Sequence, residues 1–256
     1  MKPRISALVV NGFREARRNR VTVVVLAFAA FLVLSSSTIA SAAIVTLDRV
    51  LVDVALGSAS LLLVALAVYL SCGALNSEIQ RRTIFIIMSK PISRSAFLMA
   101  RVGSILLTLA VLESLMVVLF GFEVVLFRAS FQPAQFVAFG MLFLELVVIV
   151  AFGVLMSTFS GPIVSAVVVA GLYLAGHQSR DTYARASRSA SAVVRSVGRG
   201  VYYLLPNLDR LDYKAQAAYG LSVPTGDVLW SAAYGLAYAA VVLVIATLVF
   251  DRRDFK

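Results

Sequence analysis

The chain is poor in the residues on which most catalytic and metal sites depend. It has one cysteine, Cys72, and one histidine, His177, among 256 residues. A lone cysteine inside an apolar run excludes a disulfide framework and a thiolate metal site. A lone histidine removes most metal and general-base schemes. Charged residues make up only 14% of the chain, too few for an ordinary soluble domain.

Apolar residues are abundant instead. The chain is 61% hydrophobic and its mean hydropathy is +0.93, which indicates a polytopic membrane protein. The formal charge of +10 could indicate a nucleic-acid partner. However, the basic residues lie at the ends of apolar runs, where they meet lipid headgroups and water. We therefore expect membrane lipid, and no nucleic acid, around this chain.

Six apolar runs predict an all-α polytopic membrane protein, with residues 1–256 forming one transmembrane domain. About 20 apolar residues cross a bilayer. The third run is longer than a straight crossing needs and the fifth is the shortest. If the fifth were only re-entrant, five crossings would remain and the last helix would invert. A tight polar turn is expected at 47–53, a short turn containing Pro133 at 128–135, and a hairpin at 157–162, which includes Gly161-Pro162. The expected spans are 21–45, 54–75, 95–127, 136–156, 163–176 and 228–250.

Two amphipathic segments flank these spans. Residues 1–20 hold six basic residues, with apolar residues at helical spacing, which predicts an interfacial helix. The basic start and Ala40-Ser41-Ala42 also resemble a cleavable signal peptide, but the leader is longer and more amphipathic than a signal requires. Residues 178–205 predict an amphipathic helix within an external segment, 178–226.

A compact charged stretch separates the second and third runs. Ile84, Ile87 and Met88 fall on one helical face, and Glu78 lies four residues before Arg82. Pro91 ends this helix, predicted over 78–91, and Ser93 can cap the next one. A rigid helix at the mouth of a membrane domain suits docking to a cytoplasmic protein.

This stretch resembles the coupling helix of permease subunits of ATP-binding-cassette (ABC) transporters of the type-2 exporter family. The resemblance rests on Glu78, on Arg82-Thr83-Ile84, and on the turn Lys90-Pro91-Ile92-Ser93-Arg94. Two weaker motifs agree, Leu204-Leu205-Pro206-Asn207 and Phe250-Asp251-Arg252-Arg253-Asp254-Phe255. The likeness covers nearly the whole chain in order and length.

The resemblance implies a permease in the plasma (bacterial inner) membrane, with both termini and the coupling helix cytoplasmic. The chain lacks the Gly-x-x-x-x-Gly-Lys-Ser/Thr loop that holds nucleotide phosphates. ATP and Mg²⁺ would therefore bind to a separate ATPase subunit, present in two copies, and this chain would bind no cofactor and would not itself be an enzyme. A second permease copy or a related permease would complete the pathway. The residues expected to contact the ATPase are Glu78, Arg81, Arg82, Thr83, Ile84, Ile87, Met88, Lys90, Pro91 and Arg94.

Two acids lie within the spans, Glu113 and Glu145. An ionisable group at mid-bilayer is costly and should face the bundle interior or a polar cavity. Each is a candidate for the translocation path or a gate, or else for a structural hydrogen bond to Ser, Thr or Tyr. Gly153 and Gly171 are expected to permit close helix packing. The aromatic belt at the membrane interface is expected to include Tyr173, His177, Tyr202 and Tyr203.

Three other functions remain open. The chain could transmit mechanical work to a periplasmic partner, or it could be a structural scaffold. An intramembrane enzyme would need paired catalytic groups at one depth, and a serine with His177 is the only nucleophile–base pair that the composition allows. The substrate stays open among lipids, peptides, drugs and polysaccharide precursors.

Overall fold

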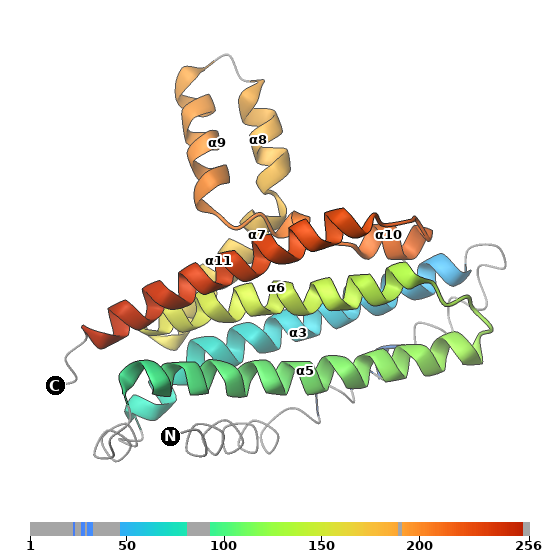
Figure 1. Cartoon of the computed structure of the whole chain (residues 1–256), viewed down its shortest axis with the longest axis horizontal. Helices are drawn as coiled ribbons and strands as arrows, with labels where there is room; N and C mark the ends of the chain where they lie inside the picture. The colour runs from blue at the N-terminus through green and yellow to red at the C-terminus, as the bar shows by residue number, and fades with distance from the viewer. Residues whose placement is uncertain are drawn as a thin grey trace.

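The computed structural model describes residues 23, 27–28, 30–32, 47–80, 93–188 and 191–252. All regular structure in these ranges is helical. Four long helices run side by side along the bundle (Figure 1): α3 (Leu47–Gln80), α5 (Arg94–Leu126), α6 (Pro133–Ser157) and α11 (Thr225–Asp251). Each is long and apolar enough to cross a membrane. The chain is therefore an integral membrane protein.

Helix α6 is the centre of the bundle. It packs against α3, α5, α7 and α11, and it is the most deeply buried of the four long helices. Proline starts it at Pro133 and also starts α7 (Pro162–His177). Proline suits the first helical turn, where its missing N–H is not needed. The predicted hairpin at 157–162 is confirmed, and so is the Ser93 cap, whose hydroxyl accepts a hydrogen bond from Ala96 N.

The expected spans agree with the structure in part. The second, third, fourth and sixth correspond to α3, α5, α6 and α11. The first lies mostly outside the described residues, although Phe28 and Leu32 are helical and buried in the core. The predicted helix 1–20 also lies outside them. The fifth span is α7, which has only 16 residues and bends by 59° into α8 (Ser179–Ser187).

The turn predicted at 47–53 is wrong, because these residues form the first turns of α3. Leu51 and Val52 are buried on the inner side of the helix, whereas Asp53 is exposed. Asp48 lies in the first turn, where a carboxylate interacts favourably with the helix dipole. Its Oδ2 also accepts hydrogen bonds from the N–H and hydroxyl of Ser130, at 3.4 and 3.1 Å.

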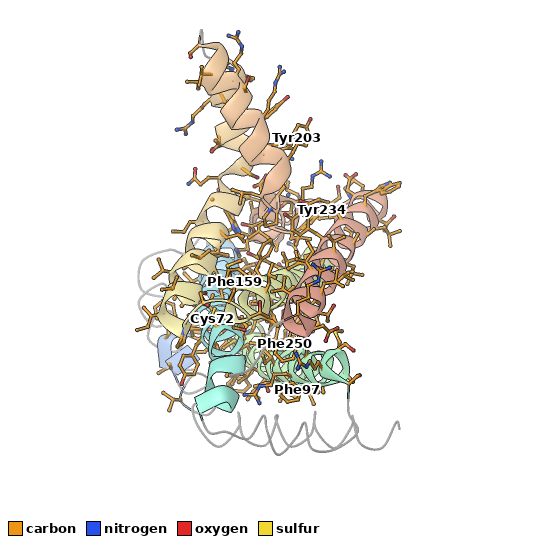
Figure 2. The ribbon with its side chains drawn as sticks, turned by 90° about the vertical axis from the view of Figure 1, so that its left-hand side faces the viewer. Cys72, Phe97, Phe159, Tyr203, Tyr234 and Phe250 are labelled. Carbon is orange, nitrogen blue, oxygen red and sulfur yellow. The ribbon has the colours of Figure 1, made fainter. Side chains whose placement is uncertain are left out.

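The single amphipathic helix predicted over 178–205 is also wrong. The structure has two helices here, α8 and α9 (Ala192–Leu204), which form a hairpin that projects away from the bundle in both Figure 1 and Figure 2. The serine-rich sequence between them favours a break, because serine side chains compete for backbone hydrogen bonds. The two helices meet where Gly198 packs directly on Ala186, and the rings of Tyr183 and Tyr202 lie 4.7 Å apart.

Residues 206–220, which we call the cap segment, fold back onto the bundle. They contain a 3₁₀ turn, η2 (Leu208–Arg210), and the short helix α10 (Lys214–Tyr219). Helix α10 packs against α3 and α6, and η2 packs against α7. Leu208, Leu211, Ala217 and Ala218 are buried in the same core as the long helices. The cap segment therefore covers the part of α3 and α6 that the short α7 does not reach.

Gly153 determines how closely α3 and α6 approach. A Cβ at this position would overlap the side chain of Ser71 on α3, so the predicted packing role is confirmed. At Gly171, in contrast, a Cβ would meet nothing within 4 Å, and the packing role predicted there is wrong.

These two glycines make a matched test of the bundle. We expect Gly153→Ala to lower the free energy of unfolding by about 1–3 kcal/mol, because α3 and α6 would have to separate. Gly171→Ala should instead raise it by about 0.5–1 kcal/mol, through helix propensity alone. Thermal unfolding of the solubilised protein measures both. Equal shifts for the two variants would contradict the close α3–α6 contact.

Candidate functional site

Four polar side chains meet where α6, α7 and the cap segment join. Glu145 comes from α6, His177 from the end of α7, Asp212 from the loop before α10, and Lys214 from the first residue of α10. We call these four residues the Glu145 cluster. Its acid was predicted to face the bundle interior, and the Glu145 side chain is indeed only 1% exposed.

His177 lies at the centre of this cluster. Its Nδ1 is 3.2 Å from the carbonyl oxygen of Tyr173. Because a carbonyl oxygen can only accept, this contact is a hydrogen bond when Nδ1 carries the proton. The other ring nitrogen, Nε2, is 3.3 Å from Glu145 Oε1 and 3.8 Å from Asp212 Oδ2. One imidazole nitrogen therefore faces two carboxyl groups.

The approach of Glu145 to His177 is close but is not aligned as a hydrogen bond. Within the part of the chain that the structure describes, neither oxygen of Glu145 has a hydrogen-bond partner. Two ionised acids facing an imidazole lone pair in a buried site would be strongly disfavoured. The arrangement therefore favours one additional proton, held on His177 Nε2 or on the Glu145 carboxyl group.

Lys214 supplies the positive charge on the outer side of the cluster. Its Nζ lies 3.4 Å from Asp212 Oδ2, and its backbone N–H donates to Asp212 Oδ1 at 3.1 Å. Asp212 therefore also holds the start of α10 in place. Through these contacts the cluster joins the cap segment to the middle of α6 and to the end of α7.

The cap segment is attached to α11 by separate contacts. The backbone N–H of Asn207 donates to the Tyr234 hydroxyl at 2.8 Å. The hydroxyls of Tyr213 and Ser231 are 3.1 Å apart, and the Arg210 guanidinium lies over the Tyr234 ring at 5.3 Å. A change in the Glu145 cluster would thus act on a segment that also contacts α11.

A groove of about 640 Å³ runs between α3 and α7 beside the cluster. Its walls are mostly apolar, and its polar groups come from Ser60, Tyr173 and Lys214. Lys214 therefore belongs both to the cluster and to the lining of this groove. An apolar groove with a few polar groups is the usual form of a site for a small amphiphilic molecule.

His177 was expected at the membrane interface, but the structure turns it toward Glu145. Because α7 is short, its last residue reaches only the level of Glu145 in the middle of α6. Asp212 and Lys214 were not predicted at all. The signal that could have identified them is the charged run Asp209-Arg210-Leu211-Asp212-Tyr213-Lys214, which is unusual in so apolar a chain.

Glu113 is not part of this cluster. It lines a separate pocket between α5 and α6, so the structure does not bring the two acids together. Of the residues predicted to contact an ATPase, Glu78 lies in the last turn of α3 and Arg94 begins α5. The others, from Arg81 to Pro91, lie outside the described residues, as does most of the predicted helix 78–91.

Among the described residues, the surroundings of His177 show neither a catalytic nucleophile nor a set of metal ligands. The described contacts of His177 include neither a serine hydroxyl nor the Cys72 thiol, so no nucleophile–base pair is assembled there. Within the described ranges, no three His, Cys, Asp or Glu residues are grouped to hold a metal ion. The arrangement can hold a proton and hold the cap segment in place.

A double-mutant cycle tests the link between Glu145 and His177. We expect the variants Glu145→Gln and His177→Gln to show a coupling energy of about 1–3 kcal/mol, because the contact is buried and removing one partner leaves the other as an unpaired polar group in the core. The pair Arg180–Asp209, with 3.2 Å between Nη1 and Oδ2, is the control: Arg180 is exposed and Asp209 half-buried, so the pair is more accessible to water and should couple by less than about 1 kcal/mol. Thermal unfolding of the single and double variants gives both values. Strictly additive effects at Glu145 and His177 would refute the link.

A comparison with known protein families identifies the family of this chain. The model of one family, described as a protein of unknown function (DUF2705), matches residues 24–256. The match includes all four residues of the Glu145 cluster. No curated protein matches the sequence. Since the matched region is nearly the whole chain, this protein belongs to the DUF2705 family.

Proposed function

We propose that this chain is the membrane-spanning permease subunit of an ABC exporter and couples ATP hydrolysis on a separate ATPase subunit to movement of a substrate. The main support is where the segment between α3 and α5 attaches. Helix α3 ends at Gln80 and α5 begins at Arg94, at the end of the bundle where α11 also ends (Figure 1). Arg94 Nη1 donates to the carbonyl oxygen of Asp251 at 3.2 Å.

Figure 2 looks onto this end of the bundle. Phe97 and Phe250 stack with their ring centroids 6.4 Å apart, which joins the first turn of α5 to the last turn of α11. A force applied to residues 81–92 would therefore act on three long helices at once. This is the mechanical requirement for a coupling element.

Helix α3 offers a path from this end to the Glu145 cluster. It has 34 residues and is about 50 Å long. It packs against α6 along its length and against α10 near its start. Displacement of its Gln80 end would be transmitted through close contacts, such as that of Ser71 with Gly153, to the helices that carry Glu145 and Lys214. The cluster would then act as a gate or latch of the pathway.

The proposal includes a membrane topology and a set of partners. The chain crosses the bacterial inner membrane six times, with both termini and residues 78–91 in the cytoplasm and residues 178–226 outside. This orientation is supported by a group of basic residues that lie close together in the sequence between the second and third spans and at the start of the third: Arg81, Arg82, Lys90, Arg94 and Arg101. Two ATPase subunits hold ATP and Mg²⁺, and a second permease copy or a related permease completes the pathway.

A second candidate is transmission of mechanical work to a periplasmic partner. The observation that favours it is the α8–α9 hairpin, which projects from the bundle (Figure 1). The hairpin exposes apolar side chains that a partner could cover, among them Val193 at 71% and Tyr203 at 77% exposure. Both candidates use the same cytoplasmic coupling element.

The coupling face can be tested directly. We expect the triple variant Ile84→Asp, Ile87→Asp, Met88→Asp to abolish co-purification with the ATPase subunit of the proposed transporter, because the charged residues could not enter an apolar groove. Membrane insertion should be unchanged. Val193→Asp on α9 is the matched control, since it adds a charge at an exposed apolar position far from the coupling segment, and it should retain the ATPase. Undiminished co-purification of the triple variant would contradict the proposal.

Thiol labelling tests the orientation. Cys72 is the single cysteine of the chain, so a Cys72→Ala background has no native thiol. In that background, Arg81→Cys and Lys90→Cys should react with a membrane-impermeant maleimide only after the membrane is opened. Tyr203→Cys should react in intact cells. Labelling of the cysteine at position 81 or 90 in intact cells would reverse the topology and exclude cytoplasmic coupling.

A further inference from the structure

A second pocket lies between α5 and α6 and takes no part in the Glu145 cluster. Its volume is about 400 Å³. Helix α5 contributes Glu113, Ser114 and Val117 to its lining, and α6 contributes Phe139, Gly140 and Phe143. It is an apolar pocket that contains one carboxyl group.

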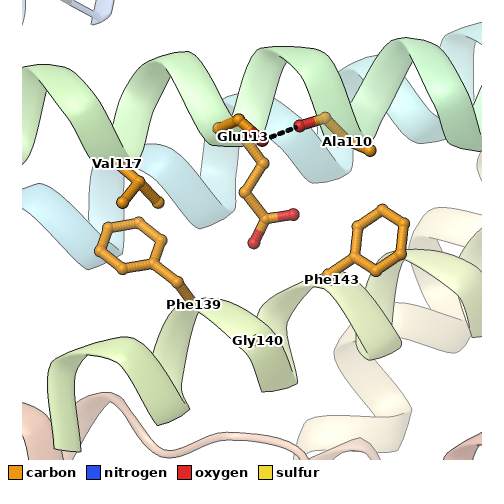
Figure 3. Close-up of a pocket in the computed structure, with 7 residues that line it drawn as sticks. Ala110, Glu113, Val117, Phe139, Gly140 and Phe143 are labelled. Atoms are coloured by element: carbon orange, nitrogen blue, oxygen red, sulfur yellow. Dashed lines mark hydrogen bonds between the residues drawn. The ribbon is translucent and has the colours of Figure 1, made fainter. Parts of the chain in front are cut away.

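The carboxyl group of Glu113 is aimed into this pocket. Figure 3 shows it extending from α5 toward α6, between the rings of Phe139 and Phe143. The residue is 6% exposed, and its Oε1 has no hydrogen-bond partner among the residues described. An unpaired carboxyl group in an apolar span is costly. It therefore calls for a cation or a proton in the pocket.

The aromatic rings narrow the choice of cation. A metal ion such as Mg²⁺ or Ca²⁺ needs about six oxygen ligands, whereas the only side-chain oxygens lining this pocket are those of Glu113 and Ser114. The faces of aromatic rings attract organic ammonium groups. Phe139 is held in place by Phe120, with ring centroids 5.6 Å apart. One acid and two rings form the set of groups that binds an alkylammonium ion.

The pocket opens on the outer surface of the bundle. Gly140 and Ser114 are exposed at its mouth, and a Cβ at Gly140 would meet nothing within 4 Å. The surrounding surface is apolar, with Val118 65% and Phe136 59% exposed. In a membrane this mouth faces hydrocarbon. A ligand that reaches it must itself dissolve in lipid.

We infer that the pocket between α5 and α6 binds a lipophilic organic cation, an amine or quaternary ammonium with an apolar substituent, whose charge pairs with Glu113. The ammonium group lies between Phe139 and Phe143, and the apolar substituent extends past Gly140 toward the lipid. If this occupant is a transported substrate, that further step rests on the proposed exporter function. Binding itself requires no ATPase.

The test uses the full chain in lipid nanodiscs with 4-phenylbutyl-trimethylammonium as the probe. Equilibrium dialysis, corrected with empty nanodiscs, measures saturable binding. We expect Glu113→Gln to weaken binding by roughly a hundredfold, because the ammonium loses its buried counter-charge. Phe143→Leu should weaken it by roughly tenfold through loss of one ring face. The neutral isostere of the probe, with a tert-butyl group in place of trimethylammonium, should not bind saturably.

Gly140→Leu offers a second variant that keeps the Glu113 carboxyl group. The added side chain has open space at its first carbon, so it should close the mouth of the pocket and abolish binding without disturbing the fold. Gly121→Leu on α5, which also has open space around its Cβ and does not line the pocket, is the control and should bind the probe like the unmodified chain. Unchanged thermal unfolding of all variants shows that they are folded.

Four outcomes would overturn the inference. Three concern binding: an absence of saturable binding, equal binding of the neutral isostere, and unchanged binding by Glu113→Gln. The fourth is disulfide cross-linking of Gly140→Cys between two copies of the chain, because a second copy would then cover the mouth. None of these results depends on an ATPase, so they are distinguishable from a failure of ATPase co-purification.

Discussion

The side chain of Glu145 is almost completely buried, so its partners have to come from inside the bundle. This constraint explains two features that would otherwise look like defects. Helix α7 has only 16 residues, and its last residue, His177, therefore lies at the level of Glu145. The cap segment then folds back between α3 and α6, and its Asp212 and Lys214 complete the set of charges. A longer α7 would occupy the space of the cap segment and leave Glu145 without a partner.

The same constraint separates the two intramembrane acids. Glu145 is matched by residues of this chain, whereas Glu113 faces aromatic rings and no cation of the described residues. Seen from the sequence, the two acids are equivalent, since each is one carboxylate inside an apolar run. Their difference arises from what the neighbouring helix presents. Glu145 has the imidazole of His177 at 3.3 Å and is thereby tied to the cap segment, whereas Glu113 has mostly aromatic rings and apolar groups around it, which suits a ligand.

Much of the helical architecture could be predicted from the sequence, because the length of an apolar run and the residues that begin or end a helix are local signals. The spans of α3, α5, α6 and α11 follow from apolar runs, and Ser93 caps α5 as expected. Pro133, which was predicted to lie in a turn, instead begins α6. The first turns of α3 were mistaken for a polar turn. There the charged residues Asp48, Arg49 and Asp53 occupy one side of a helix end, and only the burial of Leu51 and Val52 on the other side reveals it.

The site was harder to predict, because it depends on contacts between distant segments. Burial of Glu145 follows from its place in an apolar run. Its pairing with His177 depends on where α7 ends relative to α6. The approach of Asp212 to His177 depends on the path of the cap segment. Periodicity carries no information on either. The pocket at Glu113 likewise depends on Phe139 and Phe143 of α6 meeting α5, which no spacing within one helix can show.

The contact of Arg94 with the carbonyl of Asp251 has a practical consequence for anyone who handles this protein. A purification tag or fluorescent protein fused at the C-terminus would follow only a few residues after Asp251, which lies beside the first turn of α5. In the proposed transporter, the tag would share that region with the ATPase subunit that binds the segment between α3 and α5. Such a fusion would then produce the same defect as an uncoupled mutant.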